Sequence, residues 1–234
     1  MTLNVTLLPI RASLPTNDIR LHMVYDFLKR LFDLVLSVVL LVIFSPAIIL
    51  TAIAIQLDSP GPILADTPSR VGRYGRLFRM YKFRSMVQNA HETLLENPKF
   101  KKLYEEYKRG GYKLKDDPRI TMVGRITRKY SIDEVPQFIN VLRGEMSIVG
   151  PRAYYPDELR DQQKEYPHTK EAVKIVLSVK PGITGVWQVT GRSEINFDKR
   201  IQLDASYASK RSILYDLWII FKTPLAMLSG KGAM

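Results

Sequence analysis

Two adjacent carboxylates between two arginines are the residues of this sequence best suited to chemistry. Asp133 and Glu134 follow Arg128 and precede Arg152. Pro136, two residues after the acids, predicts that a helix begins here, because proline is comfortable only in the first turn, where its missing N–H group is not needed. Carboxylates at a helix start lie at the positive end of the helix dipole, which favours their ionised form and also favours phosphate binding.

The same stretch also fits a purely structural role. If the helix begins within residues 131–133, Ser131 and Glu134 have the spacing of a capping box, in which both side chains bind free backbone N–H groups. Asp133 is also a residue type that caps helices by itself. Such caps are more common than active sites, so the choice between the two interpretations depends on the rest of the chain.

Composition narrows the kinds of site and partner. The chain has 234 residues, the size of a single domain, and its lack of cysteine excludes disulfides, thiolate nucleophiles and cysteine-based zinc sites. Its three histidines have no metal-ligand spacing. Residues 1–58 contain four basic and four acidic residues, so the whole net charge of +12 lies in residues 59–234. This excess predicts an anionic partner, such as nucleic acid, anionic lipid or a phosphorylated substrate.

Residues 34–57 form an uncharged segment that predicts insertion into a membrane. As one helix the segment is about 36 Å long, enough to cross a hydrocarbon core of about 30 Å. From residue 21 onward, apolar residues at helical spacing indicate an amphipathic approach to it. Ser45 and Pro46 predict a sharp bend at its midpoint. A helix that enters, bends and returns keeps the basic flanks on one side of the membrane, but a kinked spanning helix fits the residues equally well.

The residues therefore predict three parts: a polar lead-in over residues 1–20, an amphipathic approach and membrane helix over 21–58, and a compact basic domain over 59–234. The predicted fold class is α+β and mainly helical. In the last part, the predictions are a short β-hairpin with its turn at Gly72 and Gly75, a strand over 77–86, a charged helix over 87–109, an amphipathic helix over 156–178, a loop over 180–192, and amphipathic interfacial helices that include the apolar run 214–224.

Six blocks of the chain resemble the monotopic polyprenyl-phosphate phosphoglycosyl transferases, which are bacterial sugar transferases. The resemblance runs from about residue 29 to residue 228. Because all six blocks follow one another along one chain, they are specific as a set. The blocks are Phe44-Ser-Pro46, Tyr81-Lys-Phe-Arg-Ser-Met86, Asp117-Pro-Arg-Ile-Thr121, Ser131-Ile-Asp-Glu-Val-Pro-Gln137, Ser147-Ile-Val-Gly-Pro-Arg152 and Lys180-Pro-Gly-Ile-Thr-Gly185.

The resemblance implies a re-entrant membrane helix hairpin broken at Ser45 and Pro46, with residues 59–234 as a catalytic domain on the cytoplasmic face of the bacterial inner membrane. It also implies transfer of a sugar 1-phosphate from a UDP-sugar to undecaprenyl phosphate, with release of UMP, as the first membrane step of glycan assembly. Asp133 takes the position of the family's nucleophile, which forms an aspartyl phosphosugar intermediate, and Glu134 lies beside it. Both carboxylates are expected to hold Mg²⁺, a hard cation that takes oxygen ligands.

Further residues are expected to contact the phosphates or other parts of the substrates. Arg128 and Arg152 can each hold phosphate oxygens with two N–H groups, which lysine cannot do. Through their positions in the family's motifs, the other expected contacts are Pro151, Lys82, Arg84, Asp204 and Tyr207.

The expected partners are a UDP-sugar donor, undecaprenyl phosphate and the lipids of the inner membrane, with a second copy of the chain as a further candidate and no nucleic acid. Two other interpretations stay open. A membrane-tethered protein that binds nucleic acid through its basic domain would not need Asp133. A catalytically inactive scaffold of the same fold is the third interpretation, and the intact Asp-Glu pair with both arginines argues against it.

Overall fold

The computed structural model describes residues 16–109, 114, 117–191 and 195–228. Helices make up most of this part of the chain, and its strands form two sheets of two strands each. The predicted α+β class with mainly helical content is therefore confirmed. Of the predicted lead-in over residues 1–20, residues 1–15 lie outside the described part of the chain, and the others belong to the first helix.

Two helices joined by a bend form the N-terminal segment. α1 (Thr16–Ile43) and α2 (Ser45–Asp58) are inclined by 61° across Phe44. Pro46 lies in the first turn of α2, which confirms the predicted position of the break. Among the described residues, no single helix is both long and apolar enough to cross a membrane, whereas the bent pair meets that test by length and composition alone.

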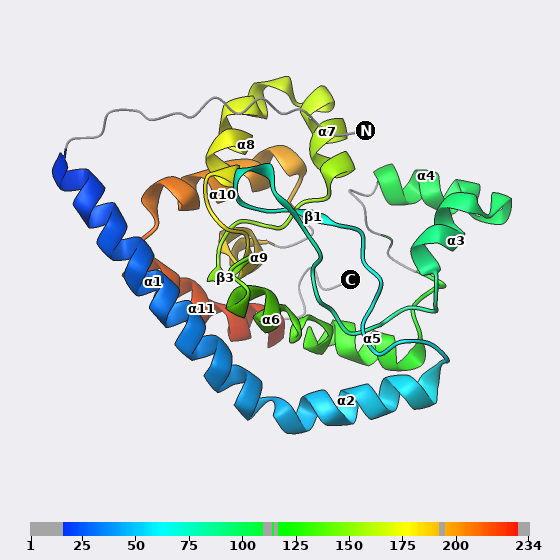
Figure 1. Ribbon diagram of the computed structural model, residues 1–234. Helices are drawn as coiled ribbons and strands as arrows, with labels where there is room; N and C mark the ends of the chain where they lie inside the picture. Colours follow the sequence, from blue (N-terminus) through cyan, green and yellow to red (C-terminus); the bar gives the residue numbers. More distant parts are fainter. Residues whose placement is uncertain (1–15, 110–113, 115–116, 192–194, 229–234) are drawn as a thin grey trace.

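Polar contacts tie α1 to the rest of the protein. Asp33 is only 3% exposed, and its carboxylate accepts hydrogen bonds from the Ser147 hydroxyl at 2.7 Å and the Ile148 N–H group at 3.1 Å. One turn earlier, Lys29 pairs with Asp216 at 2.7 Å. In Figure 1, α1 and α2 form the two arms of a V, and the other elements pack on its inner side.

The first sheet is the hairpin that the glycines predict. β1 (Arg70–Val71) pairs antiparallel with β2 (Leu77–Phe78). Gly75 in the turn has φ +76°, a conformation that glycine adopts at little cost. The strand predicted over residues 77–86 ends after Phe78, and the chain continues in an extended form with isolated bridges at Phe83 and Met86.

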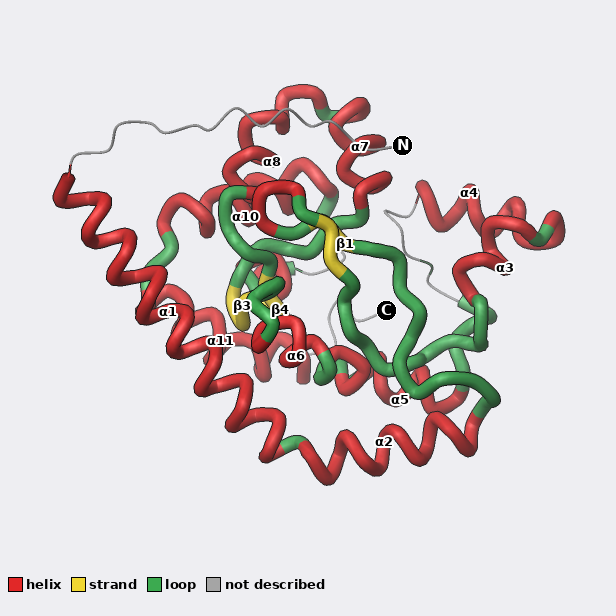
Figure 2. Tube along the Cα trace, in the orientation of Figure 1, coloured by secondary structure: helices red, strands yellow, loops and turns green. Residues whose placement is uncertain are grey.

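The second sheet was not predicted. β3 (Ser147–Val149) pairs in parallel with β4 (Gly182–Thr184), as Figure 2 shows near the centre of the molecule. The prediction of a loop over residues 180–192 is therefore wrong, because this stretch contains β4 and α9 (Val186–Thr190). A parallel partner far away in the sequence leaves no local pattern in a strand of three residues.

The charged helix predicted over residues 87–109 is interrupted. It consists of α3 (Ala90–Glu96) and α4 (Lys101–Arg109), with a turn of 3₁₀-helix beginning at Pro98 between them. Proline ends α3 because it has no N–H group to donate and its ring clashes with the preceding turn.

The helix predicted over residues 156–178 is divided in the same way. Its parts are α7 (Pro156–Glu165) and α8 (Lys170–Leu177), separated at Pro167. The remaining helices of the described part are α5 (Met122–Lys129), α6 (Gln137–Leu142), α10 (Phe197–Lys210) and α11 (Ile213–Leu228).

The main hydrophobic core surrounds β3 and α6. Its buried side chains come from α6, β3, α9, α10 and α11 and the chain next to them, and they include Phe138, Val141, Met146, Ile148, Val186, Tyr207 and Ile219. Leu36, Leu40 and Leu41 of α1 pack against this core from outside. The core thus fixes the two segments that carry the acidic pair and Arg152.

Candidate active site

The acidic pair lies on a short 3₁₀-helix, η3 (Ile132–Glu134), just before α6. Ser131 precedes it with φ +55°, and its side chain makes no capping hydrogen bond. The capping-box interpretation of Ser131 and Glu134 is therefore wrong. The predicted helix start at residues 131–133 is confirmed as this 3₁₀ turn, and Pro136 then leads into α6.

Lys82 is the cation nearest to both acids. Its Nζ lies 2.6 Å from Glu134 Oε1 and 3.9 Å from Asp133 Oδ2. The extended chain that carries Lys82 is held on both sides, since the Phe83 N–H group donates to the Asp133 carbonyl at 2.9 Å and the Tyr81 N–H group donates to Asn140 Oδ1 at 2.9 Å. The backbone thus fixes the ammonium against the acidic pair.

The two acids have opposite electrostatic properties. Asp133 is 6% exposed, and burial raises its pKa to about 6, against the opposing charge of Lys82. The side chain of Glu134 is 36% exposed, and although burial acts to raise its pKa, the ion pair with Lys82 holds that pKa below its usual value. Glu134 therefore stays ionised and bound to Lys82, while the Asp133 carboxylate has no such close partner.

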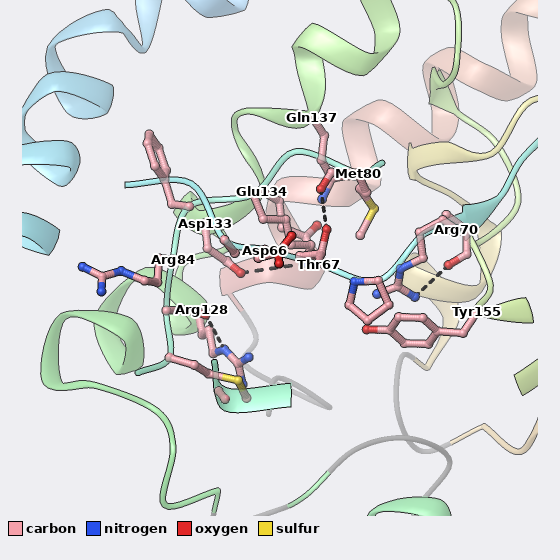
Figure 3. Close-up of a pocket in the computed structure, with 18 of the residues that line it drawn as sticks. Asp66, Thr67, Arg70, Met80, Arg84, Arg128, Asp133, Glu134, Gln137 and Tyr155 are labelled. Atoms are coloured by element: carbon pink, nitrogen blue, oxygen red, sulfur yellow. Dashed lines mark hydrogen bonds and ion pairs between the residues drawn. The ribbon is translucent and has the colours of Figure 1, made fainter. Parts of the chain in front are cut away.

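Arg128 reaches the pocket from α5. Its Nε donates to the Ser85 hydroxyl at 2.9 Å. α5 lies directly against this part of the chain, because a Cβ atom on Gly124 would be 2.0 Å from the Ser85 carbonyl oxygen. Figure 3 shows Arg128 on one side of Asp133 and Glu134, as the sequence predicts.

Arg152 reaches the pocket from the end of β3. The Gly150 N–H group donates to the Thr184 carbonyl at 2.9 Å, and the Pro151 carbonyl accepts from the Gly182 N–H group at 2.8 Å. Pro151 thus shapes the turn through its backbone. The Arg152 guanidinium lies 5.2 Å from the Trp187 ring centre.

One pocket of about 1160 Å³ brings most of the predicted site residues together. They come from the extended chain after β2, from α5, from η3 and from the end of β3. The predicted residues that line it are Lys82, Arg84, Arg128, Asp133, Glu134 and Arg152.

Asp204 and Tyr207 are not among the described residues that line this pocket, and both are buried beneath the end of β3. Asp204 is 0% exposed, and its Oδ2 accepts hydrogen bonds from the Arg152 N–H group at 3.0 Å and the Tyr154 hydroxyl at 3.1 Å. Tyr207 is 1% exposed, and its hydroxyl lies 2.6 Å from Asp216 Oδ1 and 3.1 Å from the Val149 carbonyl oxygen. Both residues of α10 position the end of β3, and through it Arg152.

Asp204→Asn removes a pH dependence of stability. Burial raises the pKa of Asp204 from the ordinary 3.8 to about 7, so between these values the folded protein holds a proton that the unfolded chain has lost. The free energy of unfolding therefore falls as pH rises from about 4 to about 7, by up to about 1.4 kcal/mol per pH unit. Thermal unfolding of both proteins across this range measures the difference, and an unchanged slope in Asp204→Asn contradicts the assignment.

Arg84 caps a helix at the edge of the pocket. Its guanidinium donates to the carbonyl oxygens of Ser59, at 2.6 Å, and of Pro60, at the C-terminal end of α2. A more distant contact joins it to the Ile55 carbonyl at 3.4 Å. These bonds link the N-terminal helix pair to the extended chain that carries Lys82 and use the guanidinium that was predicted to contact phosphate.

Arg84→Gln destabilises the protein without weakening substrate binding. Hydrogen bonds from a charged group contribute about 1.5–3 kcal/mol each, and the carbonyls at the end of α2 lose them in this variant. We expect a lower melting temperature and an unchanged KM for the donor in the folded fraction. A KM increase of tenfold or more, with the melting temperature unchanged, would instead restore the phosphate-binding role.

Arg70 and Tyr155 are pocket residues that sequence reasoning missed. The Arg70 guanidinium stacks 3.3 Å from the centre of the Tyr155 ring, and its Nη1 donates to the Ala153 carbonyl at 3.1 Å. Figure 3 shows the pair at the other side of the pocket from Arg128. In the sequence, the only signal near Arg70 was the Arg-Val-Gly start of the hairpin. It predicts a turn, but it does not indicate that Arg70 stacks on Tyr155.

The acidic pair is also the place where a metal ion fits best. In the residues that the structure describes, no group of three or more His, Cys, Asp or Glu side chains is arranged to hold a metal. Mg²⁺ is commonly bound by one or two carboxylates together with substrate phosphates and water. Asp133 and Glu134 match that ligand set, because both line the pocket beside basic side chains suited to phosphate.

Comparison with known proteins gives one consistent answer. Residues 24–230 match the family model described as bacterial sugar transferase. The chain is 43% identical to the undecaprenyl-phosphate galactose phosphotransferase of Salmonella typhimurium, over 88% of this chain and 42% of the relative. It is 38% identical to the exopolysaccharide production protein ExoY of Sinorhizobium fredii, over 88% and 87%.

A third relative is the UDP-glucose:undecaprenyl-phosphate glucose-1-phosphate transferase of Escherichia coli, 36% identical over 94% of this chain and 44% of the relative. The chain thus spans less than half of the two phosphotransferases and most of ExoY. The family match covers the bent helices, the acidic pair and both strands of the second sheet. This chain belongs to the bacterial sugar transferase family.

Proposed function

We propose that the protein is a membrane-associated phosphoglycosyl transferase that moves a sugar 1-phosphate from a UDP-sugar to undecaprenyl phosphate. The observation that carries this proposal is the buried Asp133 carboxylate in a pocket lined by Lys82, Arg128 and Arg152. Attack by a carboxylate on a diphosphate brings negative charges together, so the reaction needs fixed positive charge around the phosphates. The printed names of the relatives support the same reaction class.

The reaction proceeds in two steps. In the first, an Asp133 oxygen attacks the phosphorus atom that bears the sugar, the bond from that phosphorus to the bridging oxygen of the diphosphate breaks, and UMP leaves with that oxygen. In the second, an oxygen of undecaprenyl phosphate attacks the same phosphorus, and the acyl phosphate bond breaks to restore the Asp133 carboxylate. A covalent intermediate divides one difficult substitution into two easier ones.

The basic side chains have separate tasks in these steps. Arg128 and Arg152 bind phosphate oxygens, and their positions are fixed by Ser85 and by the Asp204 contact to the Arg152 backbone. Lys82 holds Glu134 ionised beside the nucleophile. Mg²⁺, held by Asp133 and Glu134, would neutralise charge on the phosphates when bound.

Exposed apolar side chains on two parts of the protein support a position at the membrane surface. α2 exposes large apolar side chains along its length, and it ends at the carbonyls capped by Arg84. α11 exposes Leu214, Trp218, Phe221 and Leu225, which recur at helical spacing on one face. We infer that α1 and α2 form a re-entrant hairpin in the inner membrane, with the pocket on the cytoplasmic side at the height of the polyprenyl phosphate.

The test is UMP release by the purified protein in detergent, with Mg²⁺, undecaprenyl phosphate and one UDP-sugar at a time. The donors to compare are UDP-galactose and UDP-glucose, whose sugars appear in the relatives' names, and UDP-N-acetylgalactosamine. We expect release with one of them and only in the presence of the lipid phosphate during steady turnover. Absence of release with every donor would contradict the proposed reaction.

A further inference from the structure

A second, smaller cavity lies on the far side of β3 from the acidic pair. Its volume is about 80 Å³, and it is enclosed by one face of α1, the hairpin turn, β3 and the chain that leads into β4. Its charged lining residues are Asp26, Lys29, Arg30, Asp33, Arg73, Lys180 and Arg211. No part of the proposed reaction uses this cavity.

The acids around the cavity are already neutralised. Asp33 accepts two hydrogen bonds from β3 and lies 3.9 Å from Lys29. Asp26 pairs with Arg211 at 3.4 Å. Asp216, just outside the lining, pairs with Lys29 at 2.7 Å. With Asp216 included, the five lining cations exceed the three acids at and beside the cavity by two.

The remaining cations have no anionic partner among the described residues. The Arg30 guanidinium donates to the Val141 carbonyl at 2.6 Å and the Leu142 carbonyl at 3.0 Å, and Arg73 Nε donates to the Ser178 carbonyl at 2.8 Å. These carbonyls lie at the C-terminal ends of α6 and α8, so they orient both guanidinium groups and offset only part of their charge.

Lys180 has fewer stabilising contacts than Arg30 or Arg73 in this cluster. Within the described residues it has neither a hydrogen bond nor an ion pair, although its side chain is half-buried. Burial lowers the pKa of Lys180, and the positive charge of Arg30 lowers it further, while the charge of Asp33 acts in the opposite direction. A bound anion would offset the repulsion between Lys180 and Arg30, because it places opposite charge beside both.

The membrane placement proposed above puts the cavity at the depth of lipid headgroups. Asp33 is the last charged residue before the uncharged segment 34–57, and the other face of α1 exposes Met23, Phe27 and Leu31 at a spacing of four residues. Trp218 of α11, a residue type suited to the headgroup region, is also exposed. The polar side of α1 therefore faces this cavity while its apolar side faces the bilayer.

We propose that this cavity binds the phosphate group of an anionic phospholipid, with Lys180, Arg30 and Arg73 as its ligands. The bound headgroup holds α1 at a fixed depth beside the hairpin turn and β3. This inference rests on the membrane placement of α1 proposed above and is independent of the transferase reaction. The same phosphate chemistry would also suit free inorganic phosphate, and the experiment distinguishes the two sources.

The experiment titrates lipids into the full chain purified in a neutral detergent, without any substrate. The rise in melting temperature with added phosphatidylglycerol gives an apparent Kd, because a ligand that binds the folded state stabilises it. The same titration with phosphatidylcholine and with inorganic phosphate provides the comparison. The variants are Lys180→Gln, Lys180→Arg and, as a matched control, Lys170→Gln on α8, an exposed lysine on the opposite side of the domain from α2 (Figure 1).

We expect Lys180→Gln to weaken phosphatidylglycerol binding about fivefold or more, since one basic residue near an anionic lipid surface contributes about that factor. Lys180→Arg and Lys170→Gln should bind like the wild-type protein, and phosphatidylcholine should bind weakly to all four. Equal affinity of all variants for phosphatidylglycerol would overturn the proposal. Tight binding of inorganic phosphate that depends on Lys180 would overturn the lipid assignment. Because no turnover is measured, neither outcome bears on the proposed reaction.

Discussion

Asp133→Asn abolishes turnover while the protein stays folded. An amide cannot attack phosphorus to form the acyl phosphate, so kcat should fall at least about 10³-fold. Stability should not fall, because the substitution removes a buried carboxylate whose pKa of about 6 shows that burial disfavours its charge. Steady-state UMP release and a melting curve on the same preparation measure both effects.

Asp66→Asn is the matched control for this variant. Asp66 lines the same pocket, but its side chain is 92% exposed, and within the described part of the chain it pairs only with Arg79, at 3.3 Å. Its loss should change kcat less than about threefold, as for a surface ion pair of small energy. Substantial residual activity in Asp133→Asn, or an equal loss in Asp66→Asn, would remove Asp133 as the nucleophile.

Gly182→Ala should disrupt the second sheet. Arg152 would then lose its fixed position at the end of β3. A Cβ atom on Gly182 would lie 2.1 Å from the Gly150 nitrogen and 2.4 Å from the Thr184 carbonyl oxygen, and neither backbone atom can move without breaking the β3–β4 pair. Overpacking of this kind costs typically 1–3 kcal/mol and more where backbone is involved, so we expect a loss of at least about 3 kcal/mol in unfolding free energy.

Gly144→Ala is the control that separates steric overlap from the conformational cost of replacing a glycine. Gly144 has φ +79°, but a Cβ atom there would meet nothing closer than Arg30 Nη2 at 3.6 Å. Its cost should be about 1 kcal/mol, from backbone conformation alone. Denaturant unfolding of both variants tests the comparison, and equal losses would mean that the close approach of Gly150 and Gly182 does not limit stability.

The sequence predicted the parts of the fold that depend on local patterns. The bend before Pro46 and the hairpin turn at Gly75 follow from residues that act on their own backbone. Pro98 and Pro167 also act on their own backbone, and they interrupt two helices that were predicted to be continuous. The long periodic runs of polar and apolar residues around them favoured the continuous helices. The β3–β4 pair could not be predicted locally, because three-residue strands are specified by their partner.

The sequence also predicted the main residues of the candidate site. The acidic pair with Lys82, Arg128 and Arg152 comes together in the structure as expected. Asp204 lies outside the pocket lining and accepts a hydrogen bond from the Arg152 backbone, because a motif position does not tell a residue that lines a pocket from one that positions its neighbours.

The same distinction applies to Arg84 and to the residues that were missed. Arg84 lies two residues after Lys82 in one extended segment, so the two are expected on the same face. Its guanidinium nevertheless binds carbonyls at the end of α2. Tyr155 enters the pocket beside Arg70 through packing of segments distant in sequence, which no spacing rule describes.

The central claim is the covalent step at Asp133, and a single-turnover measurement tests it most directly. The enzyme is mixed with its UDP-sugar donor and Mg²⁺ in the absence of undecaprenyl phosphate, and UMP and the intact protein mass are followed. We predict one UMP per active enzyme, a mass increase of one sugar phosphate that maps to Asp133, and loss of that mass when undecaprenyl phosphate is added. UMP that forms only with both substrates present, with no change in protein mass, would contradict the account.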